Sequence, residues 1–145
     1  VWLLRYDLAR HNIRRRGLTR FIAVCLFGGY IWLAAGGALW LVAGGAVAGP
    51  LYDAMLHVLF LGFVFAMIFG HAPLIFPSVL GRPMAYLPAV YAPLVVLHGS
   101  LALRVAGDLL GQMAARRWGG LLNGVALLLF LATTIAALAI GARKE

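Results

Sequence analysis

The chain has 145 residues, of which 64% are hydrophobic and 11% are charged, and its mean hydropathy is +0.98. Soluble domains carry about 25% charged residues, so this composition excludes an ordinary soluble domain and predicts an integral membrane protein. The formal net charge of +8 comes without any nucleic-acid recognition motif, and we therefore expect no nucleic-acid partner.

The first 20 residues form a basic segment that we expect on the cytoplasmic side of a lipid bilayer. Half of the 12 basic residues lie here, directly before an apolar run, which is typical of the cytoplasmic flank of a first membrane helix. Such a segment also attracts anionic lipid. Because Trp2, Leu4, Leu8 and Ile13 are interspersed with the charges, two interpretations stand: an amphipathic helix in the membrane interface, and an ordinary basic tail. The basic residues are Arg5, Arg10, Arg14, Arg15, Arg16 and Arg20.

Four apolar stretches follow, each longer than the ~20 residues needed to cross ~30 Å of hydrocarbon. We therefore predict an all-α fold, a single four-helix transmembrane domain over residues 1–145. In this topology nine Lys and Arg residues fall on the side of the termini and three on the other side. Both termini are accordingly expected in the cytoplasm, and a bacterial inner membrane is the expected location. The predicted helices span residues 21–46, 52–71, 87–109 and 119–142, with Tyr86, Tyr91 and Trp118 as interface anchors.

The first predicted helix contains an eight-residue repeat of glycine pairs, GGYIWLAAGGALWLVAGG. Small residues let membrane helices approach closely. Eight residues advance about 800°, or about 80° net, so the glycine track winds around the helix and meets more than one neighbour. Those neighbours are either the chain's own helices or other membrane subunits. The repeated glycines are Gly28, Gly29, Gly36, Gly37, Gly44 and Gly45.

Five of the six prolines lie between residues 73 and 93. We expect Pro73 and Pro77 to end the second helix, Pro88 to lie in the first turn of the third, and Pro93 to kink the third. Non-helical backbone at membrane depth is stable only where it is buried in protein or lines a polar cavity. The region is therefore expected to form a structured re-entrant turn.

Two histidines interrupt the apolar stretch LHVLFLGFVFAMIFGH, residues 56–71. On a uniform α-helix, the 14 positions between His57 and His71 leave the rings about 40° apart on one face and about 21 Å apart along the axis. The third predicted helix adds His98, about 9 Å from the level of His57 if the two helices are antiparallel. Ionisable residues are costly within a bilayer, so these three mark a candidate functional site.

Neutral imidazole is an axial ligand of haem iron and also binds copper. We predict that His57 and His98 hold a b-type haem near the outer face, with His71 as a second metal ligand or a quinone contact. Arg104 is a candidate partner for a haem propionate, and Ser100 for a hydrogen bond. Room for the flat macrocycle is expected at Gly62, Gly70 and Gly99.

Each of these roles has an alternative. Histidines in membrane helices also hydrogen-bond neighbouring helices, and this structural role competes with ligation. Arg104 is one turn from Asp108, which favours an i,i+4 ion pair over a propionate contact. A proton relay is less favoured, because no intramembrane carboxylate accompanies the rings in the sequence.

Two resemblances bear on the histidines. The interval between His57 and His71 is similar to the spacing of stacked haem ligands in the cytochrome b family, but that family needs a second such pair, which this chain lacks. A closer resemblance covers about 50 residues: DAMLHVLFLGFVFAMIFGHAPLIFPSVLGRP, residues 53–83, and YAPLVVLHGSLALRVAGDL, residues 91–109, resemble part of the NnrS-like family. These are polytopic haem- and copper-containing membrane proteins associated with nitric oxide and denitrification.

The NnrS-like resemblance implies that His57, His71 and His98 correspond to family histidines that bind haem or copper. Members of that family have about a dozen spans, whereas this chain has four predicted ones. The resemblance therefore implies a site that is incomplete without a partner.

Two functions remain. No phosphate loop, catalytic triad or paired-carboxylate site is present, and the single Cys25 excludes an intrachain disulfide, so we do not expect catalysis by this chain alone. The first function is a small membrane haem or haem/copper protein in electron transfer or nitric oxide-related respiration, as part of a larger complex. The second is a non-catalytic transmembrane subunit that packs against and stabilises a respiratory or photosynthetic complex.

Overall fold

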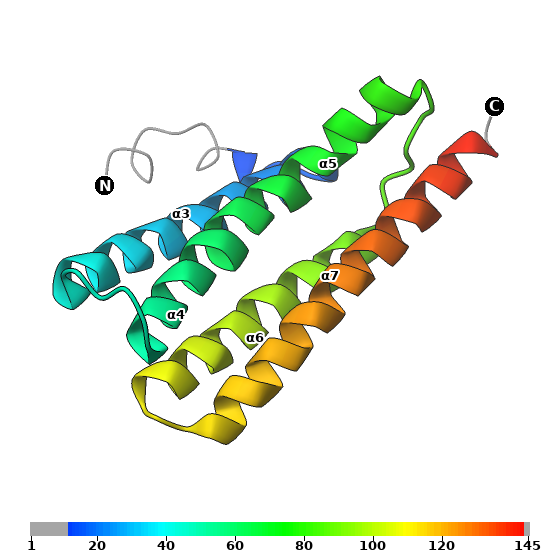
Figure 1. Cartoon of the computed structure of the whole chain (residues 1–145). Coiled ribbons are helices and arrows are strands. Elements are labelled where there is room, and N and C mark those ends of the chain that lie inside the picture. Colours follow the sequence, from blue (N-terminus) through cyan, green and yellow to red (C-terminus); the bar gives the residue numbers. More distant parts are fainter. Residues whose placement is uncertain (1–11, 144–145) are drawn as a thin grey trace.

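The computed structural model describes residues 12–143, and among these residues the regular elements are all helical (Figure 1). Four helices are long and apolar enough to cross a membrane, as the sequence predicted. The predicted N-terminal amphipathic helix falls mostly on residues 1–11, which lie outside the described part of the chain. The spans are α3 (Leu18–Ala43); α4 (Pro50–His57), the π-helical segment η1 (Val58–Val64) and α5 (Phe65–Leu80); the 3-10 turn η2 (Pro88–Val90) and α6 (Tyr91–Leu109); and α7 (Met113–Ala142).

The chain folds back and forth as four roughly antiparallel spans. The α3–α4 connection and the α6–α7 turn lie at one end of the bundle, and the α5–α6 connection lies near the C-terminal end of α7 (Figure 1). Glycines in the left-handed region mark the helix ends, because an L side chain is strained there. Gly44 (φ 57°) ends α3, Gly81 (φ 60°) ends α5, and Gly111 (φ 67°) forms the α6–α7 turn.

The prediction that prolines end the second span is wrong. Pro73 and Pro77 lie inside α5, which continues to Leu80. Each proline removes one backbone N–H, and a membrane helix tolerates this loss because its other backbone groups stay bonded along the helix. The helix ends instead at Gly81, where the backbone turns left-handed.

The connection after α5 is shorter than the predicted re-entrant turn, and its depth in a membrane stays a prediction. After α5 the chain runs without regular structure over residues 82–87, and Ala85 donates its N–H to the carbonyl of Ala137 on α7 at 3.0 Å. Gly141 permits this approach, because a side chain there would collide with the carbonyl of Pro83. The proline-rich connection is thus fastened to the last turns of α7.

Aromatic pairs join the two halves of the bundle. Phe69 of α5 stacks on Phe130 of α7 with ring centroids 4.0 Å apart, and Phe21 of α3 meets the edge of Tyr91 of α6 at 5.2 Å. Such pairs contribute about 0.5–1.5 kcal/mol beyond the apolar area they bury. They define a core that also contains Leu97.

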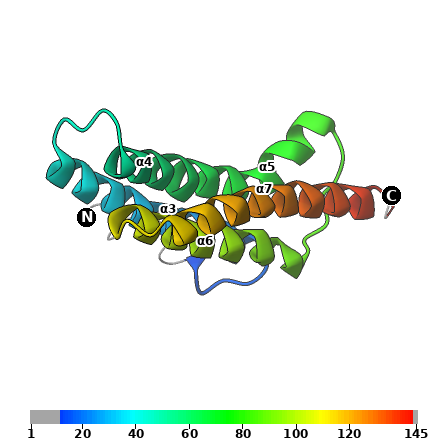
Figure 2. The same ribbon diagram turned by 60° about the horizontal axis from the view of Figure 1, so that its bottom comes forward.

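The tightest helix contact is between α6 and α7, which lie side by side in both views (Figures 1 and 2). A Cβ atom at Gly119 of α7 would lie 2.6 Å from the backbone nitrogen of Arg104, and one at Gly107 of α6 would lie 2.5 Å from that of Arg116. Only glycine fits at such a distance. The two backbones therefore meet through glycines at two levels.

Candidate functional site

His98 is held by an indole from another helix. Trp32 of α3 donates its Nε1–H to His98 Nδ1 at 2.8 Å, and the two rings meet edge to edge with their planes only 19° apart. Because an indole nitrogen only donates, Nδ1 of the neutral ring carries the lone pair and Nε2 carries the hydrogen. Nε2 is buried, has no hydrogen-bond partner among the described residues, and faces Gly28, where a Cβ atom would lie 2.9 Å away.

This arrangement bears on the predicted haem ligand. Iron binds the lone pair of an imidazole nitrogen, and the lone pair of His98 already accepts the Trp32 hydrogen bond. Ligation by His98 therefore requires that bond to break, so that iron binds Nδ1 or so that the hydrogen moves to Nδ1 and leaves the lone pair on Nε2. Haem ligation by His57 and His98 stays a prediction, and it would require the loss of the Trp32–His98 hydrogen bond.

His57 and His71 have the opposite tautomer. Nδ1 of His57 lies 2.8 Å from the carbonyl oxygen of Asp53, and Nδ1 of His71 lies 2.7 Å from that of Met67. A carbonyl only accepts, so each Nδ1 donates, and in the neutral form of each ring Nε2 carries the lone pair. Metal-ligating histidines show the same arrangement, in which one ring nitrogen donates to a carbonyl and the other ligates.

The two rings do not share one helix face. The segment η1 between them forms i→i+5 hydrogen bonds, which take up about one extra residue relative to an α-helix. The 14 positions from His57 to His71 then rotate about the helix axis as far as about 13 positions of a uniform α-helix would. The angle between the two rings becomes roughly 140° instead of roughly 40°. The stacked geometry expected from a uniform helix is not kept.

The glycines predicted to make room for a macrocycle have different surroundings. The space beside Gly62 is occupied by Trp32, because a Cβ atom added at Gly62 would lie 2.6 Å from the Cβ of Trp32. A Cβ atom at Gly70 would lie 3.0 Å from Cys25 Cβ, and one at Gly99 would have nothing within 4 Å. Within residues 12–143, no three or more His, Cys, Asp or Glu side chains are placed to hold a metal ion.

The predicted Arg104–Asp108 pair is wrong. Arg104 Nη2 of α6 donates instead to Asp53 Oδ2 of α4 at 2.9 Å, and Asp108 Oδ1 lies 2.9 Å from Arg116 Nε of α7. The i,i+4 rule describes an isolated helix, whereas here neighbouring helices supply closer partners. The guanidinium of Arg104 thus already binds Asp53, and a contact between Arg104 and a haem propionate stays a prediction.

These residues form a charge cluster that joins three helices at the end of the bundle near the α6–α7 turn. Arg116 bridges the two carboxylates, because its Nη2 also lies 3.2 Å from Asp53 Oδ2. His57 adds a contact of 3.5 Å between its Nδ1 and Asp53 Oδ1. The side chain of Asp108 is fully buried, and those of Asp53 and Arg116 are 24% and 31% exposed.

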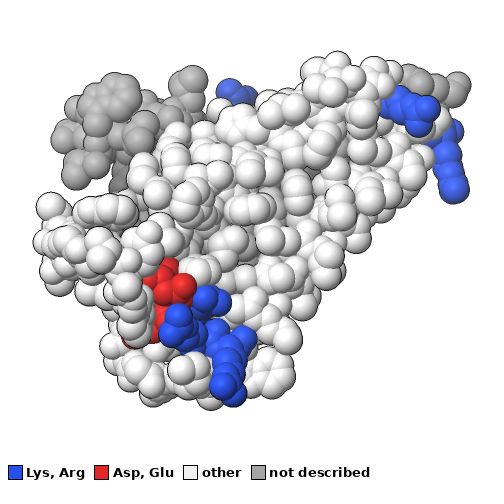
Figure 3. Space-filling view, viewed as in Figure 1, with Lys and Arg blue, Asp and Glu red and all other residues white. Residues whose placement is uncertain are grey.

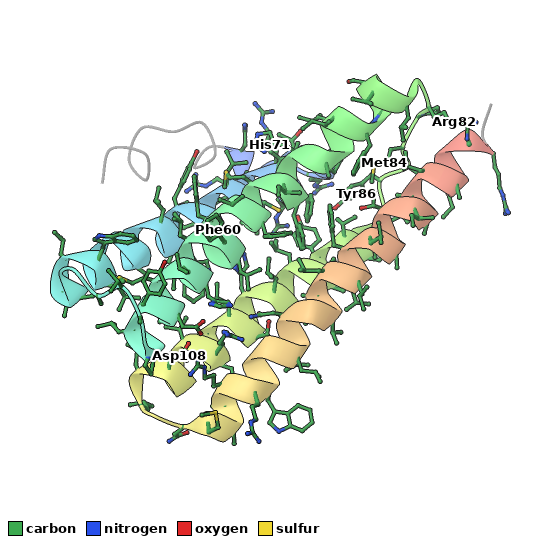
Figure 4. All side chains as sticks on the ribbon, viewed as in Figure 1. Phe60, His71, Arg82, Met84, Tyr86 and Asp108 are labelled. Atoms are coloured by element: carbon green, nitrogen blue, oxygen red, sulfur yellow. The ribbon has the colours of Figure 1, made fainter. Side chains whose placement is uncertain are left out.

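The space-filling view shows this cluster as red and blue atoms side by side at one end, while the end near the C-terminus shows only blue (Figure 3). Asp108 lies at one end of the molecule, and His71 lies well away from it along the bundle (Figure 4). The histidines are thus spread along the bundle rather than gathered in one site.

The described geometry can be compared with known proteins. The model of the family described as Domain of unknown function (DUF8744) matches residues 1–139. The chain belongs to this family. No curated protein and no solved structure gives a significant match.

In this DUF8744 chain, sequence reasoning missed the role of Asp53 and the bond between Trp32 and His98. No partner was predicted for Asp53, although its spacing of four from His57 signals a contact on one helix. Trp32 and His98 are 66 positions apart, and no local pattern links them. The buried bond from Ser100 Oγ to Asn123 Oδ1, 2.5 Å long, likewise joins two helices.

Proposed function

We propose that this DUF8744 chain is a small multi-pass membrane protein that packs as a non-catalytic subunit against a larger membrane complex. The observation that carries the proposal is the division of the glycine repeat along α3. Gly28, Gly29 and Gly36 lie against side chains of this chain's own helices. A side chain at Gly37, also within α3, would have nothing within 4 Å; the same holds at Gly44 and Gly45, which follow the last helical residue and form the end of α3.

The open half of α3 borders an apolar groove. Gly37, Trp40 and Met55 are among the residues that line it, and its volume is about 190 Å³. Lipid chains adapt to bulky side chains, so a helix that faces only lipid has no need of small residues, whereas close contact between helices does need them. Open glycines beside a half-exposed Trp40 therefore favour a second helix as the neighbour.

The charge distribution supports an orientation for this subunit. The basic end of the molecule, with Arg82 (Figure 4) and with Arg143 directly after α7, faces the cytoplasm in our proposal, and the mixed charge cluster lies on the other side (Figure 3). A bacterial inner membrane fits this arrangement. The orientation rests on the positive-inside rule, and the location rests on the basic flank and on the resemblance to the NnrS-like family.

Co-purification tests the subunit proposal. Gly37→Leu in the tagged full chain, expressed in its native membranes, should abolish recovery of partner subunits while the chain itself remains folded. Gly124→Leu is the matched control, because Gly124 of α7 also has nothing within 4 Å but lies outside the repeat. Recovery of the same partners with wild-type chain and Gly37→Leu would contradict the proposal.

The second candidate function is that His57 or His71 supplies one axial ligand to a haem, or a ligand to copper, with the remaining ligands on a partner subunit. The observation that favours it is the Nδ1–H bond of each ring to a backbone carbonyl, which leaves Nε2 able to ligate. A bound haem would supply one-electron chemistry, and the NnrS-like resemblance supports the same residues.

A reduced-minus-oxidised absorption spectrum with a pyridine haemochrome assay tests this second candidate on the complex purified from native membranes. A b-type signal lost on His57→Ala or His71→Ala but kept on His98→Ala supports it. Loss on both His57→Ala and His98→Ala supports the pair predicted from the sequence instead. A flat spectrum from a folded sample would contradict haem binding and would not affect the subunit proposal.

A further inference from the structure

Four close contacts join α3 to the second span, which consists of α4, η1 and α5 and covers Pro50–Leu80. One residue of each contact is a glycine, and a Cβ atom added there would lie 2.6–3.4 Å from the side chain of the other residue. We call this row of contacts the α3 seam. In order along the second span, its pairs are Val58–Gly36, Gly62–Trp32, Ala66–Gly29 and Gly70–Cys25.

The two sides of the α3 seam contain different numbers of residues. On the second span the seam residues are spaced by four, so the seam covers 12 positions, from residue 58 to residue 70. On α3 it covers 11 positions, from residue 25 to residue 36. This part of α3 is a continuous α-helix, whereas the second span contains η1 between the same limits. Because i→i+5 hydrogen bonds accommodate more residues per turn, η1 takes up the additional position.

Contacts with α7 lead to the same count. Asp53 lies 3.2 Å from Arg116, and Phe69 stacks on Phe130. The two α7 residues are 14 positions apart on one continuous helix, which places them about 40° apart on the same face. Asp53 and Phe69 are 16 positions apart, and on a uniform α-helix they would lie about 160° apart. With one position taken up by η1 this angle falls to about 60°, so both side chains reach α7.

The additional residue can be assigned to the exposed side of η1. Phe60 is 52% exposed, whereas Val58 and Gly62 on either side of it are buried. Without Phe60, these two residues would be three positions apart, which on a uniform α-helix leaves them about 60° apart on one side. The α3 seam would then cover 11 positions on both helices.

We propose that η1 is a one-residue rotational offset, a conformational device that turns α4 relative to α5 so that both halves of the span reach α7. The offset places Asp53 against Arg116 and thereby builds the charge cluster, while α5 keeps the α3 seam. If the same residues formed a uniform α-helix, α4 would turn by about 100° and Asp53 would leave α7. The inference concerns the fold of this chain and depends on neither proposed function.

The test removes one residue from η1 in the full chain. Deletion of Phe60 allows the second span to form a uniform α-helix with the same contacts. We expect this variant to fold in detergent with a thermal unfolding midpoint at or above that of the wild-type chain, because a regular α-helix replaces a rare π-helix. Circular dichroism melts measure the midpoint.

Deletion of Ile68 is the matched control. Ile68 is also exposed, at 43%, but it lies in α5 rather than in η1. Its removal either moves Leu61 into the place of Gly62, where Trp32 leaves no room for a side chain, or turns Gly70 away from α3. We expect a midpoint about 10 °C lower than that of the wild-type chain. Equal midpoints for the two deletions overturn the proposal.

Double-mutant cycles within the Phe60 deletion show whether both halves of the span keep their contacts. Asp53→Asn with Arg116→Gln reports on α4, and Phe69→Leu with Phe130→Leu reports on α5. Both coupling energies should equal those measured in the chain that retains Phe60. A folded deletion that has lost either coupling overturns the proposal.

A second deletion keeps the test decisive if the loss of the Phe60 ring itself prevents folding. Leu59 is the neighbouring residue of η1, and its removal restores the same count of 11 positions. If this variant folds, the same two cycles are measured in it, with the same expected result. Failure of both η1 deletions to fold overturns the proposal.

Discussion

The α6–α7 pair and the second half of α3 use the same residue in opposite ways. At Gly107 and Gly119, glycine brings two backbones of this chain together, and a Cβ atom would lie 2.5–2.6 Å from a backbone nitrogen. At Gly37, glycine faces open space. Small residues allow membrane helices to pack closely, and the structure shows which of these glycines have a neighbouring helix within this chain. The unsatisfied ones on α3 are where we place a partner.

The largest loss of stability is expected from a substitution at Gly119, where α6 and α7 are in contact. Gly119→Leu forces α6 and α7 apart, because the added side chain meets the backbone of Arg104. Overpacking costs typically 1–3 kcal/mol, and a collision with backbone should cost about 3 kcal/mol or more. Circular dichroism melts in detergent measure the loss. Gly124→Leu, five positions further along α7, should melt like wild type. Equal destabilisation by both substitutions would mean that leucine is unfavourable anywhere on α7, and it would contradict a specific contact at Gly119.

A smaller effect is expected at the charge cluster, which ties the tightly packed pair to α4. Asp53→Asn leaves the guanidinium groups of Arg104 and Arg116 without their shared carboxylate. Because these groups are partly exposed, we expect a loss of about 2 kcal/mol rather than the larger cost of a fully buried ion. The measurement is a double-mutant cycle with Arg104→Gln, in which the combined loss should be less than the sum. Strict additivity would mean that the two side chains do not interact.

The Trp32–His98 bond belongs to the part of α3 that packs against this chain's own helices. Trp32→Phe keeps the ring but removes the indole N–H, so we expect a loss of about 1 kcal/mol. The ¹⁵N shifts of the His98 ring provide a more specific reading. In the wild-type chain they should report hydrogen on Nε2, and in Trp32→Phe a mixture of tautomers. Hydrogen on Nδ1 in the wild-type chain would contradict this bond and restore His98 as a ligand.

The smallest effect on the chain alone is expected at Gly37. Gly37→Leu adds a side chain where nothing lies within 4 Å, so the melting temperature of the isolated chain should stay within the range of surface substitutions, about 0.5 kcal/mol. A large loss of stability would mean that Gly37 packs within the chain, like Gly29, and not against a partner.

The sequence was sufficient for the spans and insufficient for their contacts. Length and hydropathy define four membrane-length helices because the bilayer sets a simple requirement. The proline rule failed at Pro73 and Pro77, since it describes isolated helices, and the end of α5 is set by Gly81 instead. The winding of the glycine track did predict more than one neighbour, because it depends only on the helical repeat.

The candidate site was harder to predict for a physical reason. The i,i+4 rule paired Arg104 with Asp108, but tertiary partners from α4 and α7 lie closer. Trp32 fixes the tautomer of His98 from another helix, and only the fold brings these two residues together. Rules of local spacing identify which residues are unusual and leave their partners undetermined.

The measurement that tests the central claim most directly is photo-crosslinking from α3 in native membranes. A photoreactive amino acid at Leu41, which is 88% exposed on the open half of α3, is compared with one at Leu128 of α7, which is 69% exposed. Our account predicts that position 41 crosslinks to a different membrane protein and that position 128 crosslinks to lipid. Crosslinks to lipid alone from position 41, in membranes that contain the assembled complex, would contradict it.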